Sequence, residues 1–430
     1  MKTLQNLIIF TLFLILTGCN KQPEKITNKK DYNQFLEYTE NEMLQLTKDD
    51  YMFWEKKLEK EPHQFPYLVK AAASQSLLFN ETGTIDYLIE AERKLIEANK
   101  KTNYKNAGYL RALARNNISQ HKFREALQNL KKAEMLGEKL NATQKMLFDV
   151  HMELGNYASS ETYLKNIENY KDFDFLIRLS KWSDHKGDLD SAILYLRKAT
   201  ELAEASKNKQ IIQWSYTNLA DFYGHSSQIK EAYNYYIKSL SMNPNNAYAK
   251  KGIAWIVYAY ENNPEEALRI LNVISETHKA PDYYLLKSEI AEYMGNKTEK
   301  KSNLDTYLSI IENQKYGDMY NKHKAIIYAE EVNKKERALE IANKEIKNRP
   351  TPQSYDLLAW SYYLLGDEKE ALNIMETYVD NKTFEPETLY HLALIYKANG
   401  KKNKALYLKN QLSNCTFELG PIMSNNVNKI

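Results

Sequence analysis

Glycine, proline and cysteine are all scarce in this chain, and each shortage excludes a class of protein. Only 13 glycines and 10 prolines occur in 430 residues, too few for the turn clusters that separate the strands of a sheet protein. Leucine, alanine, glutamate, lysine and tyrosine are abundant instead, and these residues favour helices joined by short turns. The composition therefore predicts an all-α fold.

Cysteine is limited to Cys19 and Cys415, which is too few for a disulfide framework. The surroundings of Cys19 predict that it is chemically modified, so no intrachain disulfide is expected. Cys415 lies in an apolar stretch with Phe417 and Leu419. This setting favours a small buried hydrophobe over a reactive thiol.

An excess of charge of either sign is also missing. The 59 basic and 56 acidic residues are interleaved along the chain and give a formal net charge of +3. A chain so balanced has no long-range field that would gather nucleic acid or coat a membrane surface. Nucleic acid is therefore not an expected partner.

Motifs that carry chemistry are not found in the sequence. There is no Cys-x2-Cys and no His-Glu-x2-His, and the eight histidines are scattered, so no metal site is predicted. No Gly-x-Ser-x-Gly elbow, phosphate loop or dinucleotide fingerprint occurs either. We predict no catalytic residues and no cofactor. An enzyme could arise only from an unrecognised arrangement of residues.

The one long apolar run lies at the start of the chain. Residues 7–16 are apolar apart from Thr11, and they follow the basic Lys2. A helix of about ten residues covers only about half of the hydrocarbon core of a bilayer, so the run is typical of a signal peptide and not of a membrane span. We expect residues 1–18 to be removed.

The motif Leu16-Thr17-Gly18-Cys19 closes this run and resembles the lipobox of bacterial lipoproteins. The resemblance implies that Cys19 is acylated and becomes the first residue of the mature protein; an ordinary cleaved signal with a chance cysteine is the alternative. Two or more acyl chains hold a protein at a membrane far better than one. Residues 19–30 are polar and unpatterned, and we interpret them as a lipidated flexible tether. The predicted location is the cell envelope, at the outer membrane, with the periplasmic or surface face left open.

A repeated pattern fills the rest of the chain. An alanine followed by leucine, isoleucine or tyrosine recurs at Ala126, Ala192, Ala232, Ala267, Ala338, Ala371 and Ala405. The last three of these alanines are 33 and 34 residues apart. The fullest copy of the surrounding frame is Tyr216-x2-Leu219-Ala220-x2-Tyr223-x8-Ala232-x3-Tyr236-x7-Pro244.

This frame resembles the helix-turn-helix signature of the tetratricopeptide repeat (TPR). Leu219, Ala220 and Tyr223 fall on one face of a helix, where the small Ala220 lets the second helix approach closely. The resemblance implies a right-handed α-solenoid of about nine to ten TPR-like helix-turn-helix repeats with helical caps.

The frame also divides the chain. Repeats are predicted to begin near Ala107, Asn141, Phe173, Gln213, Ala247, Pro281, Met319, Pro352 and Pro386, after a divergent repeat at 65–100. This assigns 31–64 to an N-terminal helical cap, 65–412 to the solenoid and 413–430 to a C-terminal cap and tail, because a terminal repeat would otherwise expose its stacking face. The buried anchors expected in the first cap are Phe35, Met43, Tyr51, Phe53 and Trp54. In the second cap, Gly420 and Pro421 are expected to end the helix before a frayed tail.

The resemblance also implies a binding groove, because the first helices of TPR proteins line a concave surface that meets an extended peptide or a partner helix. Counting from the repeat frame, the candidate groove residues are Arg111, Arg115, Arg178, Lys181, Thr217, Asn218, Asp221, Lys251, Trp255, Tyr258, Trp360 and Tyr363. Trp255 and Tyr258 are the most informative, since they are large aromatic residues off the predicted core face; packing in the core is the alternative for each. Asn218 and Lys251 fit only part of the carboxylate clamp of TPR co-chaperones, so that clamp is not predicted.

Two histidines stand at equivalent places near the ends of first helices in adjacent repeats, His185 and His225. They could share one wall of the groove. We interpret them as solvated residues beside loops.

Together these features predict a membrane-anchored scaffold of the cell envelope that binds a protein or peptide partner and contacts the membrane through its N-terminal lipid. One alternative is a lipoprotein that captures a glycan or peptide for an outer-membrane import system, similar to the TPR-containing glycan-binding subunits of nutrient importers. Those subunits carry long non-repeat insertions, whereas the repeats here run almost uninterrupted. The other alternative, an enzyme, has no sequence feature in its favour.

Overall fold

The computed structural model describes residues 24–37 and 41–430, and this part of the chain is helical. Within these two ranges there are α-helices α2 to α24, a π-helical turn η1 (Ile256–Tyr260), a 3-10 turn η2 (Gln314–Tyr316) and no β-strand. None of the described helices is long and apolar enough to cross a membrane. The predicted signal peptide and lipobox, with Cys19, lie outside the described residues.

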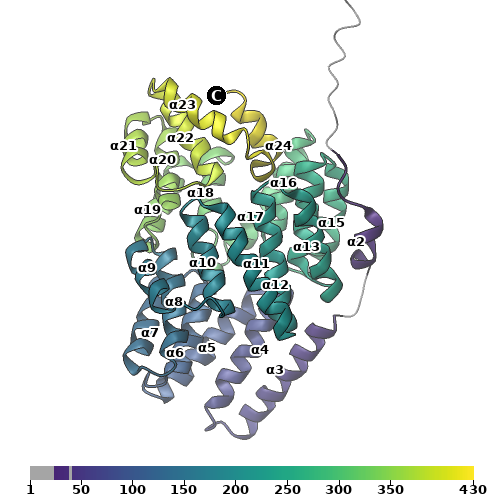
Figure 1. Cartoon of the computed structure of the whole chain (residues 1–430), viewed down its shortest axis with the longest axis vertical. Helices are drawn as coiled ribbons and strands as arrows, with labels where there is room; N and C mark the ends of the chain where they lie inside the picture. The colour runs from purple at the N-terminus through teal and green to yellow at the C-terminus, as the bar shows by residue number, and fades with distance from the viewer. Residues whose placement is uncertain (1–23, 38–40) are drawn as a thin grey trace, which may run out of the picture.

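Neighbouring helices pack in pairs, and each pair packs on the next along a curved path (Figure 1). The ten pairs in the described ranges are α4 Pro66–Thr82 with α5 Ile85–Lys101, α6 Ala107–Ser119 with α7 Phe123–Leu136, α8 Leu140–Glu153 with α9 Tyr157–Asn166, α10 Phe173–His185 with α11 Leu189–Ser206, α12 Lys209–His225 with α13 Ile229–Met242, α14 Ala247–Trp255 and η1 with α15 Pro264–Thr277, α16 Asp282–Tyr293 with α17 Lys297–Ile311, α18 Asn321–Glu330 with α19 Lys335–Asn348, α20 Pro352–Leu365 with α21 Glu368–Tyr378, and α22 Pro386–Ala398 with α23 Lys402–Leu412. The predicted all-α solenoid of about nine to ten helix-turn-helix repeats is confirmed.

The residues of the repeat frame explain these hairpins. Ala220 of α12 and Ala232 of α13 are both buried, and small side chains at a helix crossing allow a short distance between the axes. Gly366 ends α20 in the left-handed conformation, with φ of 91°, where a residue with a Cβ atom would be strained. Asn263 begins α15 by accepting a hydrogen bond from the backbone N–H of Glu266, with Pro264 at the first helical position.

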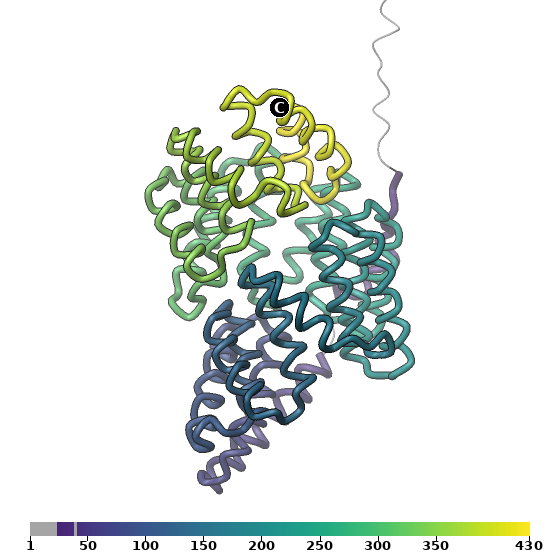
Figure 2. Tube along the Cα trace, turned by 60° about the vertical axis from the view of Figure 1, so that its left-hand side comes forward, coloured from purple at the N-terminus to yellow at the C-terminus, as the bar shows by residue number. Residues whose placement is uncertain are grey.

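The solenoid winds so tightly that successive turns of the superhelix touch (Figure 2). At the end of α4, the carbonyl of Thr82 accepts a hydrogen bond of 2.7 Å from the backbone N–H of Lys279, just before α16. At the end of α8, Glu153 pairs with Arg349, just before α20, at 2.8 Å. Each contact joins a repeat to the repeat six positions further along. The first helices therefore surround an inner space.

The predicted N-terminal cap implies that the N-terminal segment packs beside the first repeat. The structure places the start of this segment elsewhere. Helix α2 (Lys29–Leu36) packs on α13 and α15, more than 200 residues along the chain. Residues 24–30 are not the flexible tether that their composition predicts, because the backbone N–H groups of Ile26 and Thr27 bind the carboxylate of Glu261. Sequence patterns report local periodicity and cannot show such a distant docking site.

Helix α3 (Glu42–Lys60) forms the start of the stack, and it packs against α4. Of its predicted buried anchors, Met43 is 37% exposed and Phe53 is 52% exposed, so both predictions are wrong. The physical reason is the position of α3 at the end of the solenoid. Only one side of a terminal helix meets a neighbour, and these two side chains lie on its free side.

At the other end, α24 (Thr416–Val427) consists of two helical segments joined by a kink, and the first segment ends at Gly420, as the sequence predicts. Gly420 is non-helical, with φ of 72° and ψ of 170°, and a second helical segment, which the sequence analysis did not predict, follows from Pro421. The tail is not frayed, because Lys397 donates a hydrogen bond of 2.9 Å to the carbonyl of Lys429 and Ile430 packs on the apolar residues beside α23. Cys415 is half-buried, and burial raises the pKa of its thiol.

Candidate functional site

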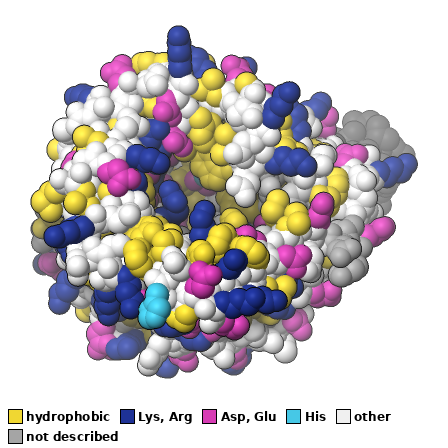
Figure 3. Space-filling view, turned by 90° about the horizontal axis from the view of Figure 1, so that it is seen from below, with side chains coloured by type: hydrophobic (Ala, Val, Ile, Leu, Met, Phe, Trp, Pro, Cys, Tyr) yellow, Lys and Arg dark blue, Asp and Glu magenta, His cyan; other side chains and the backbone are white. Residues whose placement is uncertain are grey.

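The inner space of the superhelix contains three adjoining cavities, with volumes of about 740, 540 and 460 Å³. The first and second share Tyr248, Lys251 and Asp282 in their walls. The second and third share Trp255 and Glu289, among others. The three cavities therefore form one continuous channel, which we call the lumen. Figure 3 shows the molecule hollowed at its centre when it is seen from below.

The first cavity is lined by amides and aromatic rings. Helix α12 contributes Trp214, Thr217 and Asn218, and α14 contributes Tyr248 and Lys251. Further amides come from the loop between α13 and α14, at Asn243, Asn245 and Asn246. Trp214 is 42% exposed and Tyr248 is 51% exposed, so large apolar rings face solvent inside the molecule. A site of this kind offers stacking surfaces and groups that both donate and accept hydrogen bonds.

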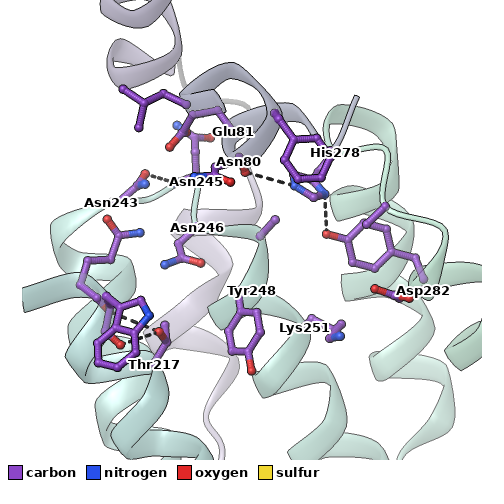
Figure 4. A pocket seen from close by; sticks show the side chains of 18 of the residues that line it. Asn80, Glu81, Thr217, Asn243, Asn245, Asn246, Tyr248, Lys251, His278 and Asp282 are labelled. Carbon is purple, nitrogen blue, oxygen red and sulfur yellow. Dashed lines mark hydrogen bonds between the residues drawn. The ribbon is translucent and has the colours of Figure 1, made fainter. Parts of the chain in front are cut away.

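One wall of the first cavity is a contact between two turns of the superhelix (Figure 4). His278 lies between Asn80 of α4 and Tyr283 of α16. Burial lowers the pKa of His278, so the ring is neutral at neutral pH. The Tyr283 hydroxyl donates to Nδ1 at 2.8 Å, while Nε2 lies 3.4 Å from the carbonyl of Asn80 and donates to it in that tautomer. The wall is thereby fixed by hydrogen bonds.

The second cavity holds a network of charged and hydroxyl groups. Asp221 of α12 accepts hydrogen bonds from the hydroxyls of Tyr236 and of Tyr248, the latter at 2.6 Å, and burial raises the pKa of this carboxyl. His225 lies 3.1 Å from the carboxylate of Glu418 on α24. Burial lowers the pKa of His225, but the hydrogen bond to Glu418 and the nearby carboxylates outweigh it and raise that pKa to about 9. His225 is therefore a cation at neutral pH.

The third cavity is acidic. Its walls carry the carboxylates of Glu289, Glu292, Glu330, Glu331, Glu385, Glu387 and Glu418. Lys300 lies in the same walls and pairs with Glu292 and Glu331. Burial lowers the pKa of His323, which is also in these walls, so its ring is neutral at neutral pH. Burial, with the charges of other glutamates, raises the pKa of Glu289 to about 7. A cationic group entering this cavity would relieve the repulsion between these carboxylates.

The structure places some of the predicted groove residues in the lumen. Thr217, Asn218 and Lys251 line the first cavity, and Asp221 and Trp255 line the second. That these residues bind a partner stays a prediction. The others lie outside the three cavities, and they are Arg111, Arg115, Arg178, Lys181, Tyr258, Trp360 and Tyr363.

Three of the four outlying basic residues are held by partners in a neighbouring helix or loop. Arg111 donates to the carbonyl of Glu138 at 2.8 Å, and Arg178 pairs with Asp149 on α8 at 2.5 Å. Lys181 pairs with Glu153, also on α8, at 2.9 Å. These side chains connect one repeat to the next. Their charged groups are therefore already paired and are not available to a ligand.

Two aromatic predictions are wrong. Tyr258 is fully buried, and its hydroxyl donates to Glu289 at 3.2 Å. It lies in η1, and the wider turn of a π-helix rotates later side chains relative to the 3.6-residue period from which its position was predicted. Trp360 is also buried, because its ring stacks on His391 at 4.0 Å and its N–H donates to Glu330 at 2.7 Å.

The two singled-out histidines are not free solvated residues. His185 stacks on Tyr157 with 4.1 Å between ring centroids, and burial lowers its pKa. His225 pairs with Glu418, as described. They do not meet on one groove wall, since only His225 borders the lumen cavities.

Sequence reasoning missed the loop residues of the lumen. Asn243, Asn245 and Asn246 stand beside Pro244, a composition that indicates a turn and gives no sign of a cavity wall. His278 follows the end of α15 and Asp282 begins α16, positions that give no sign of a cavity wall either. Trp214 is one of five tryptophans in the chain, and this rarity is the one signal that could have drawn attention to it. Among the described residues, no group of histidine, cysteine and carboxylate side chains could hold a metal ion.

Comparison with known proteins agrees with the helix-turn-helix units. The family model for the tetratricopeptide repeat matches residues 174–206 and 215–246. The chain contains TPR units. These two matches cover α10 with α11 and most of α12 with α13. The lumen residues from Thr217 to Asn246 therefore lie within a TPR unit.

The chain is also similar to a TPR repeat-containing protein of known sequence. It is 26% identical over 327 residues to the TPR repeat-containing protein MJ1428 of Methanocaldococcus jannaschii, a match that covers 67% of this chain and 56% of that protein. The chain therefore spans little more than half the length of this relative.

Solved structures with a similar course include a tetratricopeptide repeat protein from Parabacteroides merdae, at 20% identity and a TM-score of 0.34 over 56% of this chain and 93% of that one. Pseudomonas aeruginosa pilF has 14% identity and a TM-score of 0.37, covering 50% of this chain and 96% of its own. Yeast Tom70 has 14% identity and a TM-score of 0.37, covering 90% and 93%.

Proposed function

We propose that this protein is a scaffold of the cell envelope, held to a membrane by a lipid on Cys19, and that its lumen binds an extended segment of another protein. The observation that carries the proposal is the lumen itself: three joined cavities whose walls combine exposed aromatic rings, amides and carboxylates. TPR units serve in protein interaction, and this lumen is a large concave feature of the described residues.

The chemistry of the lumen fits a peptide. The side-chain amides of asparagine carry a donor and an acceptor, as each peptide group does, so they can pair with an extended backbone. Trp214 and Tyr248 offer surfaces for apolar side chains of the segment. The acidic third cavity favours a lysine or arginine. We therefore expect a partner segment that pairs an apolar part with a cationic residue.

The peptide site can be tested with a double substitution, Trp214→Ala with Lys251→Ala. We expect the apparent affinity for the partner to fall by roughly 30-fold, because an aromatic anchor in a desolvated site contributes about 2 kcal/mol or more. Less partner should then be recovered from detergent-solubilised membranes. Recovery is measured by affinity purification and quantitative mass spectrometry. The matched control is Tyr407→Ala with Lys369→Ala, an exposed tyrosine and lysine outside the three cavities. Equal recovery by the two variants would remove the first cavity as the binding site.

The membrane anchor is tested separately with Cys19→Ala. The unaltered chain should be found in the membrane fraction and should incorporate an alkyne-bearing fatty acid, because two or more acyl chains give stable anchoring. The variant should lose both properties. As a control, Cys415→Ala should keep both. Labelling of Cys19→Ala at the level of the unaltered chain would contradict the proposed lipidation.

A further inference from the structure

The first described residues form a strap, residues 24–37, that is bound to the outside of the solenoid (Figure 1). Glu261, which follows η1, accepts hydrogen bonds at 2.8 Å and 2.6 Å from the backbone N–H groups of Ile26 and Thr27. Its other carboxylate oxygen accepts the Thr27 hydroxyl at 2.8 Å. One carboxylate thus holds two consecutive residues of the strap.

A second carboxylate, Glu266 on α15, holds the strap helix α2. The Tyr32 hydroxyl donates to it at 2.9 Å within the core, and Lys29 pairs with it at 2.6 Å. Arg269 completes the site, with one nitrogen that reaches both Glu266 and Asn33, each at 2.6 Å. Although burial raises the pKa of Glu266, the hydrogen bonds from Arg269, Lys29 and Tyr32 lower it to about 2. The carboxylate is therefore charged at neutral pH.

The strap is therefore part of the folded body and not a tether that lets the body rotate freely. Tyr32 and Phe35 belong to the main apolar core with residues of α13 to α15. Cys19 precedes Glu24 by five residues. An extended chain of that length spans at most roughly 18 Å. A lipid on Cys19 would consequently hold the membrane close to this side of the solenoid.

The two ends of the described chain lie at one end of the molecule. In Figures 1 and 2 the start of the strap and α24 are both found in the upper part of the view, whereas the turn between α3 and α4 is at the bottom. The hollow in Figure 3 is seen from that lower end.

We propose that the strap fixes the orientation of the solenoid on the lipid surface, with the end at which the strap begins, beside Glu261, facing the bilayer and the lower opening of the lumen facing away from it. This inference rests on the proposed lipid at Cys19. A partner segment then enters the lumen from the aqueous side. The lipid surface is contacted by the region around the strap and not by the first repeats.

The orientation can be measured by energy transfer to the membrane. The full-length chain, with Cys415→Ser, is added to vesicles of phosphatidylethanolamine and phosphatidylglycerol that contain an acceptor-labelled lipid. A donor dye is attached at one of two exposed positions: Glu265→Cys, beside the strap site, or Gln64→Cys, in the turn between α3 and α4. We expect strong energy transfer from a dye at position 265 and weak transfer from a dye at position 64.

Releasing the strap provides the second arm. The double variant Glu261→Ala with Glu266→Ala should bind the vesicles as before, but the difference between the two dye positions should be lost. Glu231→Ala, an exposed glutamate on α13, is the matched control and should keep the difference.

Equal transfer from the two positions in bound, unaltered protein would overturn the fixed orientation while leaving the lipid anchor intact. A difference that survives release of the strap would show that another surface sets the orientation, and would also overturn the proposal. Protein that does not bind the vesicles at all would instead refute the proposed lipidation, so the two failures are distinguishable.

Discussion

Replacement of Asp356 by alanine is expected to lower the free energy of unfolding by about 3–5 kcal/mol, because it leaves a buried charge without its partner. Asp356 of α20 and His391 of α22 are both buried and lie 3.0 Å apart. The same carboxylate accepts the hydroxyl of Thr388 at 3.1 Å. Removing the carboxylate therefore strands two polar groups between the last repeats.

This pair also predicts a pH dependence. Burial lowers the pKa of His391, but the charge and hydrogen bond of Asp356, with the charges of Glu387 and Glu330, outweigh it and raise that pKa above its ordinary value. A group whose pKa is raised in the folded state contributes stability that is fully present below its unfolded pKa of about 6.5. That contribution is lost as the pH rises through the folded pKa. The deficit of Asp356→Ala should therefore be largest at pH 6 and smaller in alkaline solution.

Denaturant unfolding at several pH values, followed by circular dichroism, measures both effects. Asp305→Ala is the matched control, since Asp305 forms an exposed ion pair with Lys301 and such pairs contribute about 0–1 kcal/mol. A deficit for Asp356→Ala that equals that of the control, or that does not change with pH, would contradict the role given to this pair.

Gly252→Val is expected to cost about 3 kcal/mol, through overpacking and not through lost contacts. Gly252 lies within α14, and a Cβ atom there would be 2.3 Å from the ring of Tyr236 on α13. That ring is buried, and its hydroxyl is bound to Asp221, so it cannot move aside without breaking the hydrogen-bond network of the lumen. The variant should also bind the partner more weakly.

The control for this prediction is Gly108→Val, the corresponding change at another helical glycine. A Cβ atom on Gly108 would lie 3.2 Å from the side-chain oxygen of Asn106 and otherwise has room. Valine is the better helix former, so we expect a change within about 0.5 kcal/mol. The melting temperatures of the two variants, measured by differential scanning calorimetry, should differ clearly. Similar values would show that α13 and α14 can separate at no cost.

The helix pairs could be predicted because each is specified locally. Alanine at a crossing such as Ala220, a left-handed glycine such as Gly366, and a capping asparagine such as Asn263 act within one repeat. The sequence shows all three at the spacing of about 34 residues. The fold class follows from them without reference to any distant contact.

The lumen and the strap could not be predicted in this way, because contacts between distant residues create them. Thr27 binds Glu261 across 234 residues, and the glutamate at that position looks like an ordinary solvated residue at a helix end. Trp214 faces an inner space that exists only because the superhelix closes on itself. Tyr258 was misplaced for a different reason, the π-helical turn, which the periodicity of a regular helix does not reveal.

The touching turns have a consequence for how the molecule comes apart. In an open repeat array each unit interacts with its two neighbours only, so stability behaves as a linear sum and the ends fray first. Here three contacts join one turn of the superhelix to the next. They are the hydrogen bond from Lys279 to Thr82, the ion pair of Arg349 with Glu153 and the ion pair of His225 with Glu418. Melting of one unit thereby removes support from a unit on the adjacent coil. Repeats on adjacent turns should therefore unfold together, and their amide hydrogens should exchange at similar rates although they lie far apart in the sequence.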